Sequence, residues 1–409
     1  MTAFASALAA AAYNVEASWA ENVTTFPTRL RVIGEVDTSG LEQKKIPVQT
    51  VEQLLQGGQP GVYGPKGGTF KLKFWLCGHG SSTAGATAAT DLPTLLGYSF
   101  GGNSVSAANG TTFTGGTATV PTTTASATFA SGSLCRGGSV GDGRGNGQFA
   151  AISTHVTNTL NLLTGFDAAP NNGDVLYSAE NIYLAELPAS SAVTGLRFLL
   201  QNNNLQYECH GCFATSIALG TPINGELPFV EVTYQCSWWT YSTATFPSAL
   251  TAQAFAPAFG GGAGSSFMLQ TKGTATRVGA KRTVRSTAIT LNLGVQPLYG
   301  PGGVDTNQVI VGATRTPGNP TVEWIEDAPA TTAAPGLETD STTNFHLMLT
   351  LSGVAGTAVG FYCPNIYLLD KPVQMSDGGL NRLKYMARCC AVDGSATDLL
   401  ASSVRMAFA

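Results

Sequence analysis

The sequence is short of charged side chains, which make up 11% of its 409 residues, against about a quarter in an average soluble protein. A disordered chain, or a monomer with a fully solvated surface, needs more charge than this. The net charge of −4 also argues against a protein that grips nucleic acid, because phosphate binding depends on clustered lysine and arginine. We therefore expect a folded chain whose surface is partly covered by further copies of itself.

Long apolar runs and a cysteine framework are missing as well. No apolar stretch approaches the length of a membrane-spanning helix, and the short run Ala7–Ala12 is not a signal peptide. Eight cysteines in 409 residues are too few for a disulfide scaffold. The sequence predicts a soluble, reduced protein that is made in the cytoplasm and has no membrane contact.

Threonine, serine, alanine and glycine are abundant instead, and the apolar runs are bounded by glycine, proline and Asn or Asp. Apolar runs with such boundaries are the pattern of paired strands. We therefore predict an all-β fold with short helices. The length allows two domains, each able to bury its own core.

An internal repeat organises the chain. The stretch Tyr207–Cys236 returns as Phe361–Cys390 without a gap, at a constant offset of 154 residues. Each copy is predicted to contain a strand, a turn-rich connection and a second strand. The offset aligns Cys209 with Cys363, Phe213 with Tyr367, Gly225 with Gly379, Phe229 with Leu383, and Cys236 with Cys390.

Three further landmarks recur in the same order. Phe4–Leu8 returns as Phe246–Leu250, the turn Tyr63–Gly68 as Tyr299–Gly303, and the alternating strand Phe70–Leu76 as Phe345–Leu351. A colinear series of this kind favours a tandem duplication. The prediction is a first module over residues 1–242, with a large insertion at about 79–200, and a second module over residues 243–409.

The remaining segments carry local signals. The Ala-rich lead, residues 1–26, suits a short helix or an arm, and short helices are predicted at Thr50–Leu55 and Asp91–Leu96. The tract Gly101–Ser133 and the Gly-rich run Gly137–Gly147 are predicted loops. A second insertion between the Tyr299 turn and Phe345 has the composition of an exposed loop. Further strands are predicted at 29–33, 153–163, 175–187 and 286–293. The tail at 402–409 is interpreted as a last strand or a docking peptide.

Two motifs resemble reactive sites. Gly97-Tyr98-Ser99-Phe100-Gly101 fits the string of a nucleophile elbow, but a helix precedes the serine where a strand is needed, so we interpret it as a turn. Cys209-His210-Gly211-Cys212 with Cys236 offers zinc ligands. Strand alternation points Cys209 away from His210 and Cys212, and the second copy has Pro364 and Ile366 instead, so these cysteines are interpreted as buried hydrophobes.

The other candidates are weaker. The glycine runs at 64–68 and 137–147 lack the Lys-Ser/Thr ending of a phosphate loop and are interpreted as turns. The basic run is interpreted as a solvated or intersubunit face, with a phosphate site as the alternative; it comprises Arg277, Lys281, Arg282 and Arg285. Two acidic pairs could serve a glycosidase; they are Glu226 with Glu231 and Glu323 with Glu326. Trp238, Trp239 and Tyr241 are interpreted as an interface, with sugar stacking as the alternative.

Taken together, the lead Phe4–Leu8, the strand entry Gly67–Phe70, the short helix Leu92–Gly97 and the repeated segments ending at Cys236 and Cys390 resemble the tail tube proteins of tailed bacteriophages. The resemblance is to the lineage whose chain carries two tube modules. It implies β-sandwich or barrel modules, six to a ring, so that a homotrimer has pseudo-sixfold symmetry and rings stack into a tube. DNA passes through the lumen without specific binding.

The resemblance also implies partners and a location. The partners are further copies of the chain and other tail proteins such as the tape measure and the terminator. The location is the virion tail, after assembly in the host bacterial cytoplasm. We expect no enzyme activity, no catalytic residues, no metal and no cofactor. The alternatives are a capsid decoration or host-glycan-binding adhesin protein and, as an enzyme, a glycan-degrading virion protein.

Overall fold

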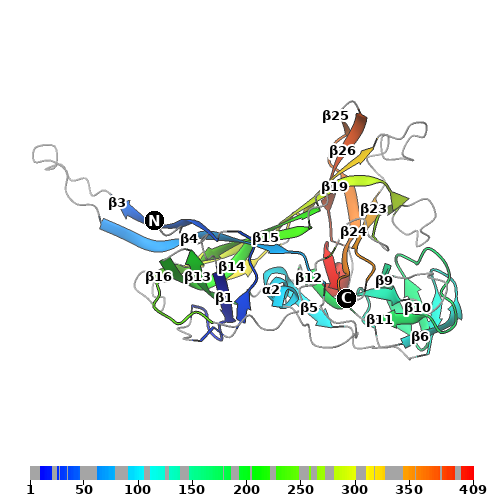
Figure 1. Ribbon diagram of the computed structural model, residues 1–409, viewed down its shortest axis with the longest axis horizontal. Helices are drawn as coiled ribbons and strands as arrows, with labels where there is room; N and C mark the ends of the chain where they lie inside the picture. The colour runs from blue at the N-terminus through cyan, green and yellow to red at the C-terminus, as the bar shows by residue number, and fades with distance from the viewer. Residues whose placement is uncertain are drawn as a thin grey trace, which may run out of the picture.

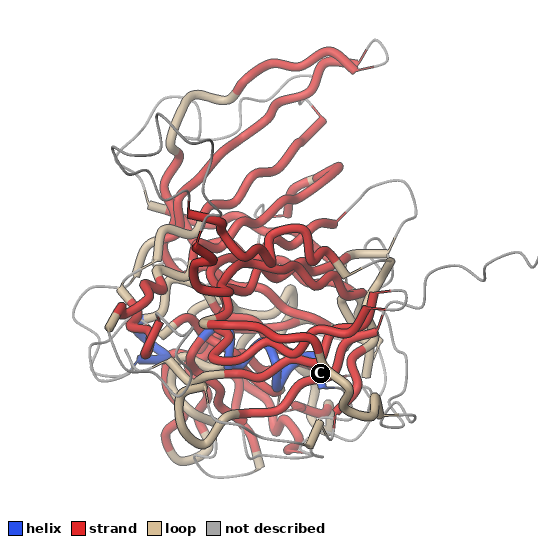
Figure 2. Tube along the Cα trace, turned by 90° about the vertical axis from the view of Figure 1, so that its left-hand side faces the viewer, coloured by secondary structure: helices blue, strands red, loops and turns tan. Residues whose placement is uncertain are grey.

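The computed structural model describes residues 10–20, 25–26, 28–34, 36–46, 62–78, 91–105, 111–124, 129–138, 147–177, 179–185, 193–202, 205–221, 227–247, 258, 265–271, 281–300, 310–316, 318–327, 344–354, 356–377, 380–391 and 398–409. Strands dominate these residues, and the helices are short (Figures 1 and 2). The predicted all-β class is confirmed. The molecule is elongated, with a strand arm at one end and a small inserted domain at the other (Figure 1).

Besides β5 (Gly101–Val105) and β12 (Glu180–Leu184), the first half of the chain contributes eight strands to one large sheet. They are β1 (Ala10–Val15), β2 (Thr28–Leu30), β3 (Asp37–Ile46), β4 (Val62–Trp75), β13 (Leu196–Asn202), β14 (Leu205–Thr221), β15 (Phe229–Cys236) and β16 (Trp238–Tyr241). The long strand β14 connects them, because its first part pairs with β13 and β16 and its last part pairs with β15. Further out, β13 is followed by β1 and β2, and β15 by β4 and β3.

The second half adds nine strands to the same sheet. They are β17 (Ser266–Thr271), β18 (Lys281–Arg282), β19 (Val284–Asn292), β22 (Thr321–Asp327), β23 (Phe345–Leu351), β24 (Val359–Leu368), β25 (Val373–Asp377), β26 (Leu380–Cys389) and β27 (Arg405–Phe408). A separate hairpin, β20 (Val295–Tyr299) with β21 (Ile310–Arg315), follows β19.

The two halves pair their strands in the same order. In the first half, neighbours run β2–β1–β13–β14–β15–β4–β3. In the second half, neighbours run β18–β17–β23–β24–β26–β22–β19. Strand β25 follows β24 along the same edge of β26. At the start of β14 lies β16, and at the start of β24 lies β27. The order of pairing is therefore the same in both halves, with β24 and β25 together in the place of β14.

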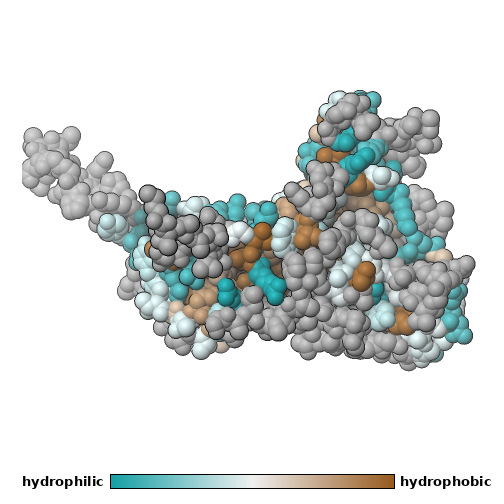
Figure 3. Space-filling view, in the orientation of Figure 1, coloured by the Kyte–Doolittle hydropathy of each residue, from teal (hydrophilic) through white to brown (hydrophobic). Residues whose placement is uncertain are grey.

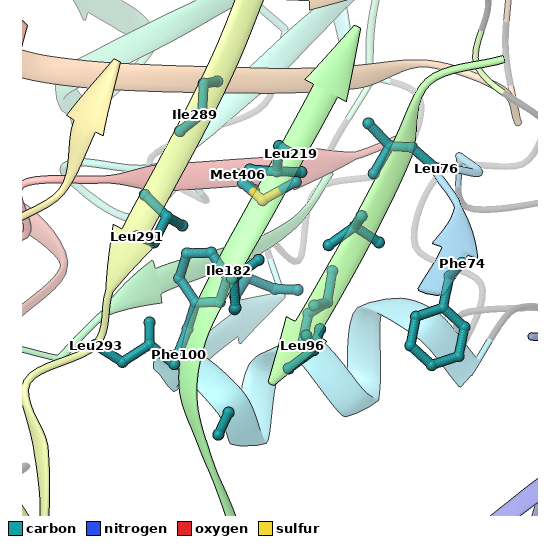
Figure 4. Packing of buried hydrophobic residues seen from close by; sticks show 14 of the residues in the cluster. Phe74, Leu76, Leu96, Phe100, Ile182, Leu219, Ile289, Leu291, Leu293 and Met406 are labelled. Carbon is teal, nitrogen blue, oxygen red and sulfur yellow. The ribbon is translucent and has the colours of Figure 1, made fainter. Parts of the chain in front are cut away.

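The halves meet where β14 pairs antiparallel with β19, over six residue pairs from Ser216–Asn292 to Thr221–Thr287. Helix α2 (Asp91–Phe100) lies across this junction (Figure 4). One hydrophobic cluster holds the helix, both strands and β27 together, with Leu96, Phe100, Leu219, Leu291 and Met406 buried. A single core therefore spans the two halves.

The predicted insertion contains a domain of its own. Six strands close into a barrel; they are β6 (Thr111–Gly116), β7 (Pro121–Thr123), β8 (Leu134–Gly138), β9 (Phe149–Val156), β10 (Thr159–Leu162) and β11 (Val175–Tyr177). Phe113, Ile152, Leu160, Phe166 and Leu176 fill it. The flanking elements α2 and β12 (Glu180–Leu184) pack instead on the shared core. Strand β12 pairs with β5 (Gly101–Val105) on one edge and with β27, which follows α3 (Asp398–Ala401), on the other.

Most predicted strands are confirmed, and the helix at Asp91 runs four residues further than predicted, to Phe100. Gly101, at φ +89°, follows it and suits a left-handed turn after a helix. The predicted helix at residues 50–55, the lead repeat at 4–8 and the loop at 139–146 lie outside the described residues.

Several loop and lead predictions were wrong. Within the lead, residues 10–15 form strand β1, because the fully buried Ala11 and Ala12 lie between β13 and β2 and tertiary pairing overrides helix propensity. The tract at 101–133 holds β5, β6 and β7, and the stretch from 310 to 327 holds β21 and β22. Strand β14 continues to Thr221, into the connection that was predicted to be rich in turns, because β15 pairs with it as far as Gly220 and β19 as far as Thr221.

One predicted equivalence was also wrong. Phe70–Leu76 (β4) pairs with β15, whereas Phe345–Leu351 (β23) pairs with β24. By position, the counterpart of β4 is β22, and that of β23 is β13. The two segments look alike because each alternates apolar residues toward a core.

Candidate functional site

The nucleophile-elbow string lies in the last turn of helix α2 and not in a turn between a strand and a helix. Ser99 is buried, its hydroxyl donates to the Leu95 carbonyl at 2.9 Å, and it lies 3.2 Å from the Tyr234 hydroxyl. Arg315 donates to the Ser99 carbonyl at 2.9 Å. The interpretation as a loop turn was wrong, and these contacts give Ser99 a packing role between α2, β15 and β21.

The cysteine cluster lies inside the first half. Cys209, Cys212 and Cys236 are completely buried, and burial raises the pKa of the Cys212 thiol to about 12. A hydrogen bond with Cys209, together with burial, raises the pKa of Cys236 well above its usual range. His210 stacks on Trp238 with ring centroids 3.8 Å apart. Over the described residues, no group of three or more His, Cys, Asp and Glu side chains is placed to hold a metal ion.

The prediction that Cys209 and Cys212 point to opposite faces of the strand was wrong. Gly211 has φ +56°, and the pairing of β13 with β14 shifts register there, with Phe198 opposite Cys209 and Leu196 opposite Cys212. This bulge places Cys209 and Cys212 together in the core, although regular alternation separates them.

The C-terminal cysteine pair corrects the alignment by one residue. Cys363 faces Cys389, with 2.9 Å between the Sγ atoms, whereas Cys390 is only half-buried. Cys389, not Cys390, therefore takes the place of Cys236. A shift of one residue moves every side chain of a strand to the other face, and the buried side chains of β26 are Tyr385, Ala387 and Cys389.

The charged candidates are paired with one another. Lys281 contacts Asp167, Arg282 lies 3.7 Å from Glu326, and Arg285 donates to Asp327 at 2.9 Å. Glu231 lies 3.7 Å from Lys71, and Glu323 lies 2.8 Å from Lys384. The predicted basic face is thus compensated by carboxylates; Arg277 lies outside the described residues.

The acidic pairs do not converge. Glu323 is partly exposed on β22, whereas Glu326 is buried on the other face of the same strand. Burial raises the pKa of Glu326, and the Trp324 indole donates to it at 2.9 Å. Glu323 and Glu326 therefore do not form a glycosidase pair, and Glu226 lies outside the described residues.

The aromatic candidates divide between core and surface. Trp239 is buried, Trp238 is half-buried, and Tyr241 is 60% exposed. Tyr207 lies 5.6 Å from Trp239 and 5.5 Å from Tyr241, measured between ring centroids. The glycines of 64–68 lie within strand β4 and not in a turn, and Gly137 and Gly138 end strand β8.

Two strand edges form the candidate functional surface. Among the described residues, β3 pairs only with β4, and β25 pairs only with β26. An unpaired edge presents a row of free N–H and C=O groups and invites another strand. The four side chains from Val373 to Ser376 are all exposed, with Val373 at 57% and Met375 at 37%. Sequence reasoning did not single out either edge, because the partner of a strand is set by the tertiary fold.

No protein-family model matches the chain, and no curated protein matches its sequence. Neither of the two described helices, α2 with ten residues and α3 with four, is long enough to span a membrane. The function therefore has to be inferred from the fold and its surfaces.

Replacing Gly211 with alanine is expected to destabilise the first half by about 2–4 kcal/mol, the sum of a left-handed backbone and overpacking. A Cβ at this position meets the Ser237 hydroxyl at 2.4 Å and the Trp19 indole nitrogen at 3.1 Å. The matched control is Gly34→Ala, where φ is +69° and nothing lies within 4 Å. Urea unfolding measures both variants, and equal losses would contradict a role for the space around Gly211.

Proposed function

We propose that the chain is a tail tube protein of a tailed bacteriophage with two tube modules that arose by duplication. The observation that carries the proposal is the β14–β19 junction, where two halves with the same order of strand pairings join edge to edge. Repetition of this arrangement from chain to chain generates a ring. Three chains then supply six modules, and stacked rings form the tube.

The charge distribution supports a conduit for DNA. Few lysines and arginines are available, and Lys281, Arg282 and Arg285 each contact a carboxylate. Every phosphate contact retards a moving DNA strand, so a lumen without a basic stripe conducts better. In this proposal the partners are further copies, the tape measure and the terminator. The protein assembles in the host bacterial cytoplasm and ends in the virion tail.

Negative-stain electron microscopy of the purified chain tests the proposal. Hollow rings or tubes with a central lumen are expected, with trimers as the building unit in mass photometry. Discrete particles without a lumen, at every protein concentration examined, would contradict the tube.

The alternative function is a capsid decoration or host-glycan-binding adhesin protein. The observation that favours it is the exposed ring of Tyr241 beside Tyr207, with the Lys66 ammonium 5.4 Å from the ring of the neighbouring Trp239. An exposed tyrosine ring, with an apolar face and a polar hydroxyl, suits contact with a sugar. A glycan array decides this alternative: binding that is lost in Tyr241→Ala supports it, and absence of binding removes it.

A further inference from the structure

The β14–β19 junction inside the chain is an example of a strand that is hydrogen-bonded along both of its edges. Strand β14 has β15 on one edge and β19 on the other over Ser216–Gly220. Thr221 and Thr287 add a side-chain link, with the Thr287 N–H donating to the Thr221 hydroxyl at 3.2 Å. Ile217 and Leu219 on β14, like Ile289 and Leu291 on β19, are buried.

The counterpart of β14 in the second half is β25, and the counterpart of β19 in the first half is β3. Among the described residues, each of these two strands has a neighbour on one edge only. Strand β25 occupies the position of the last part of β14, since each pairs with the strand that follows it along the chain. Strand β3 occupies the position of β19, since β3 pairs with β4 as β19 pairs with β22. Both β3 and β19 also shift register near their first residues, between Asp37 and Gly40 and between Val284 and Ser286.

The open edge of β25 is chemically suited to pairing. The described side chains of β25 are Val373, Gln374, Met375 and Ser376, which carry no charge and are exposed on both faces of the strand. Natural edge strands are normally protected by charge, proline or a covering segment. Apolar residues lie among polar ones on the projection that carries β25 and β26 (Figures 1 and 3).

The two edges lie well apart along the long axis of the molecule, β3 on the arm and β25 on the opposite side of the centre (Figure 1). They therefore do not satisfy each other within one chain. We infer that β25 of one copy pairs antiparallel with β3 of a second copy, in the way that β14 pairs with β19 inside the chain. The contact is head to tail, and its closure into a ring rests on the proposed function.

Cysteine crosslinking tests this interface in the full-length protein. Ser39 on β3 and Val373 on β25 are both exposed, so Ser39→Cys and Val373→Cys leave the core intact. Seven of the eight native cysteines are buried, and Cys390→Ser, added to every variant, removes the half-buried one. Each variant is purified alone, and the two are mixed, assembled and treated with a short bismaleimide.

A covalent dimer is expected from the mixture of Ser39→Cys with Val373→Cys and not from either variant alone. The matched control mixes Val373→Cys with Thr114→Cys, whose side chain is exposed on the inserted barrel, and is expected to give no dimer. Assembly without the β3–β25 crosslink, or an equal yield from the control mixture, would overturn the interface.

A second variant tests the same edge without crosslinking. Met375→Lys places a charge on β25 and is expected to abolish self-association while the circular dichroism spectrum stays unchanged. Unchanged association would overturn the interface. The experiments also distinguish the two proposals. Tubes that form without the β3–β25 crosslink would support the tube and contradict this interface. Crosslinked chains that form no lumen would support the interface and contradict the tube.

Discussion

Replacing Trp324 with alanine is expected to lower the free energy of unfolding by about 3–5 kcal/mol, the usual cost of removing a large buried aromatic side chain. Trp324 is fully buried at the centre of β22. Its ring stacks on Tyr385 with centroids 5.1 Å apart and contacts Phe267 at 5.5 Å. The substitution empties the core between β17, β22 and β26, and the space left is too enclosed to collapse fully.

Chemical denaturation followed by circular dichroism measures this loss, and the control is Trp238→Ala. Trp238 is half-buried and stacks on His210, so its loss removes less buried surface. A loss for Trp324→Ala no greater than for Trp238→Ala would contradict the central position of Trp324. Because β22 supports β26 and β26 supports β25, the variant is also expected to assemble poorly.

Replacing Arg405 with methionine is expected to destabilise the protein by about 2–4 kcal/mol, because two buried carbonyl groups lose charged donors. Arg405, on β27, is 1% exposed and donates to the carbonyls of Gly132 and Leu400, each at 2.8 Å. Burial lowers the pKa of its guanidinium to about 10, so it remains charged near neutral pH. The Arg405 side chain therefore links Gly132, which lies just before barrel strand β8, to the second half.

Differential scanning calorimetry and limited proteolysis measure the consequence. Arg405→Met is expected to lower the melting temperature and to release the barrel for earlier cleavage. Lys71→Met is the control, since Lys71 has a 49% exposed side chain and pairs with Glu231 at 3.7 Å, and surface pairs contribute about 1 kcal/mol or less. Equal effects of the two substitutions would show that the contacts of Arg405 with Gly132 and Leu400 contribute no more to stability than an exposed ion pair.

Much of the local structure could be read from the sequence. The alternation of Phe70, Leu72 and Phe74 marks β4, and the capped Asp91 segment marks α2. The offset of 154 residues aligned Cys209 with Cys363, and both cysteines lie buried in corresponding strands of their halves. These signals are local, because side-chain periodicity and helix starts depend on neighbours along the chain.

Other features could not be predicted from the sequence, because a bulge or a shift of one residue moves the side chains of a strand to its other face. The Gly211 bulge turned Cys212 toward Cys209, and Cys389 took the position assigned to Cys390. The apolar alternation of β4 and β23 was alike, yet the two strands occupy different places in the sheet. Periodicity reports that a strand has a buried face but does not name the strand beside it.

The sequence by itself determined the all-β class and the low charge of the chain, because composition and the spacing of apolar residues are properties of the chain. Only the tertiary structure decided that β14 and β19 join the two halves edge to edge and that β3 and β25, among the described residues, each have a strand on one edge alone. The physical reason is that backbone hydrogen bonds between strands are made by groups that every residue carries. Which strands pair is therefore settled by the packing of the whole core.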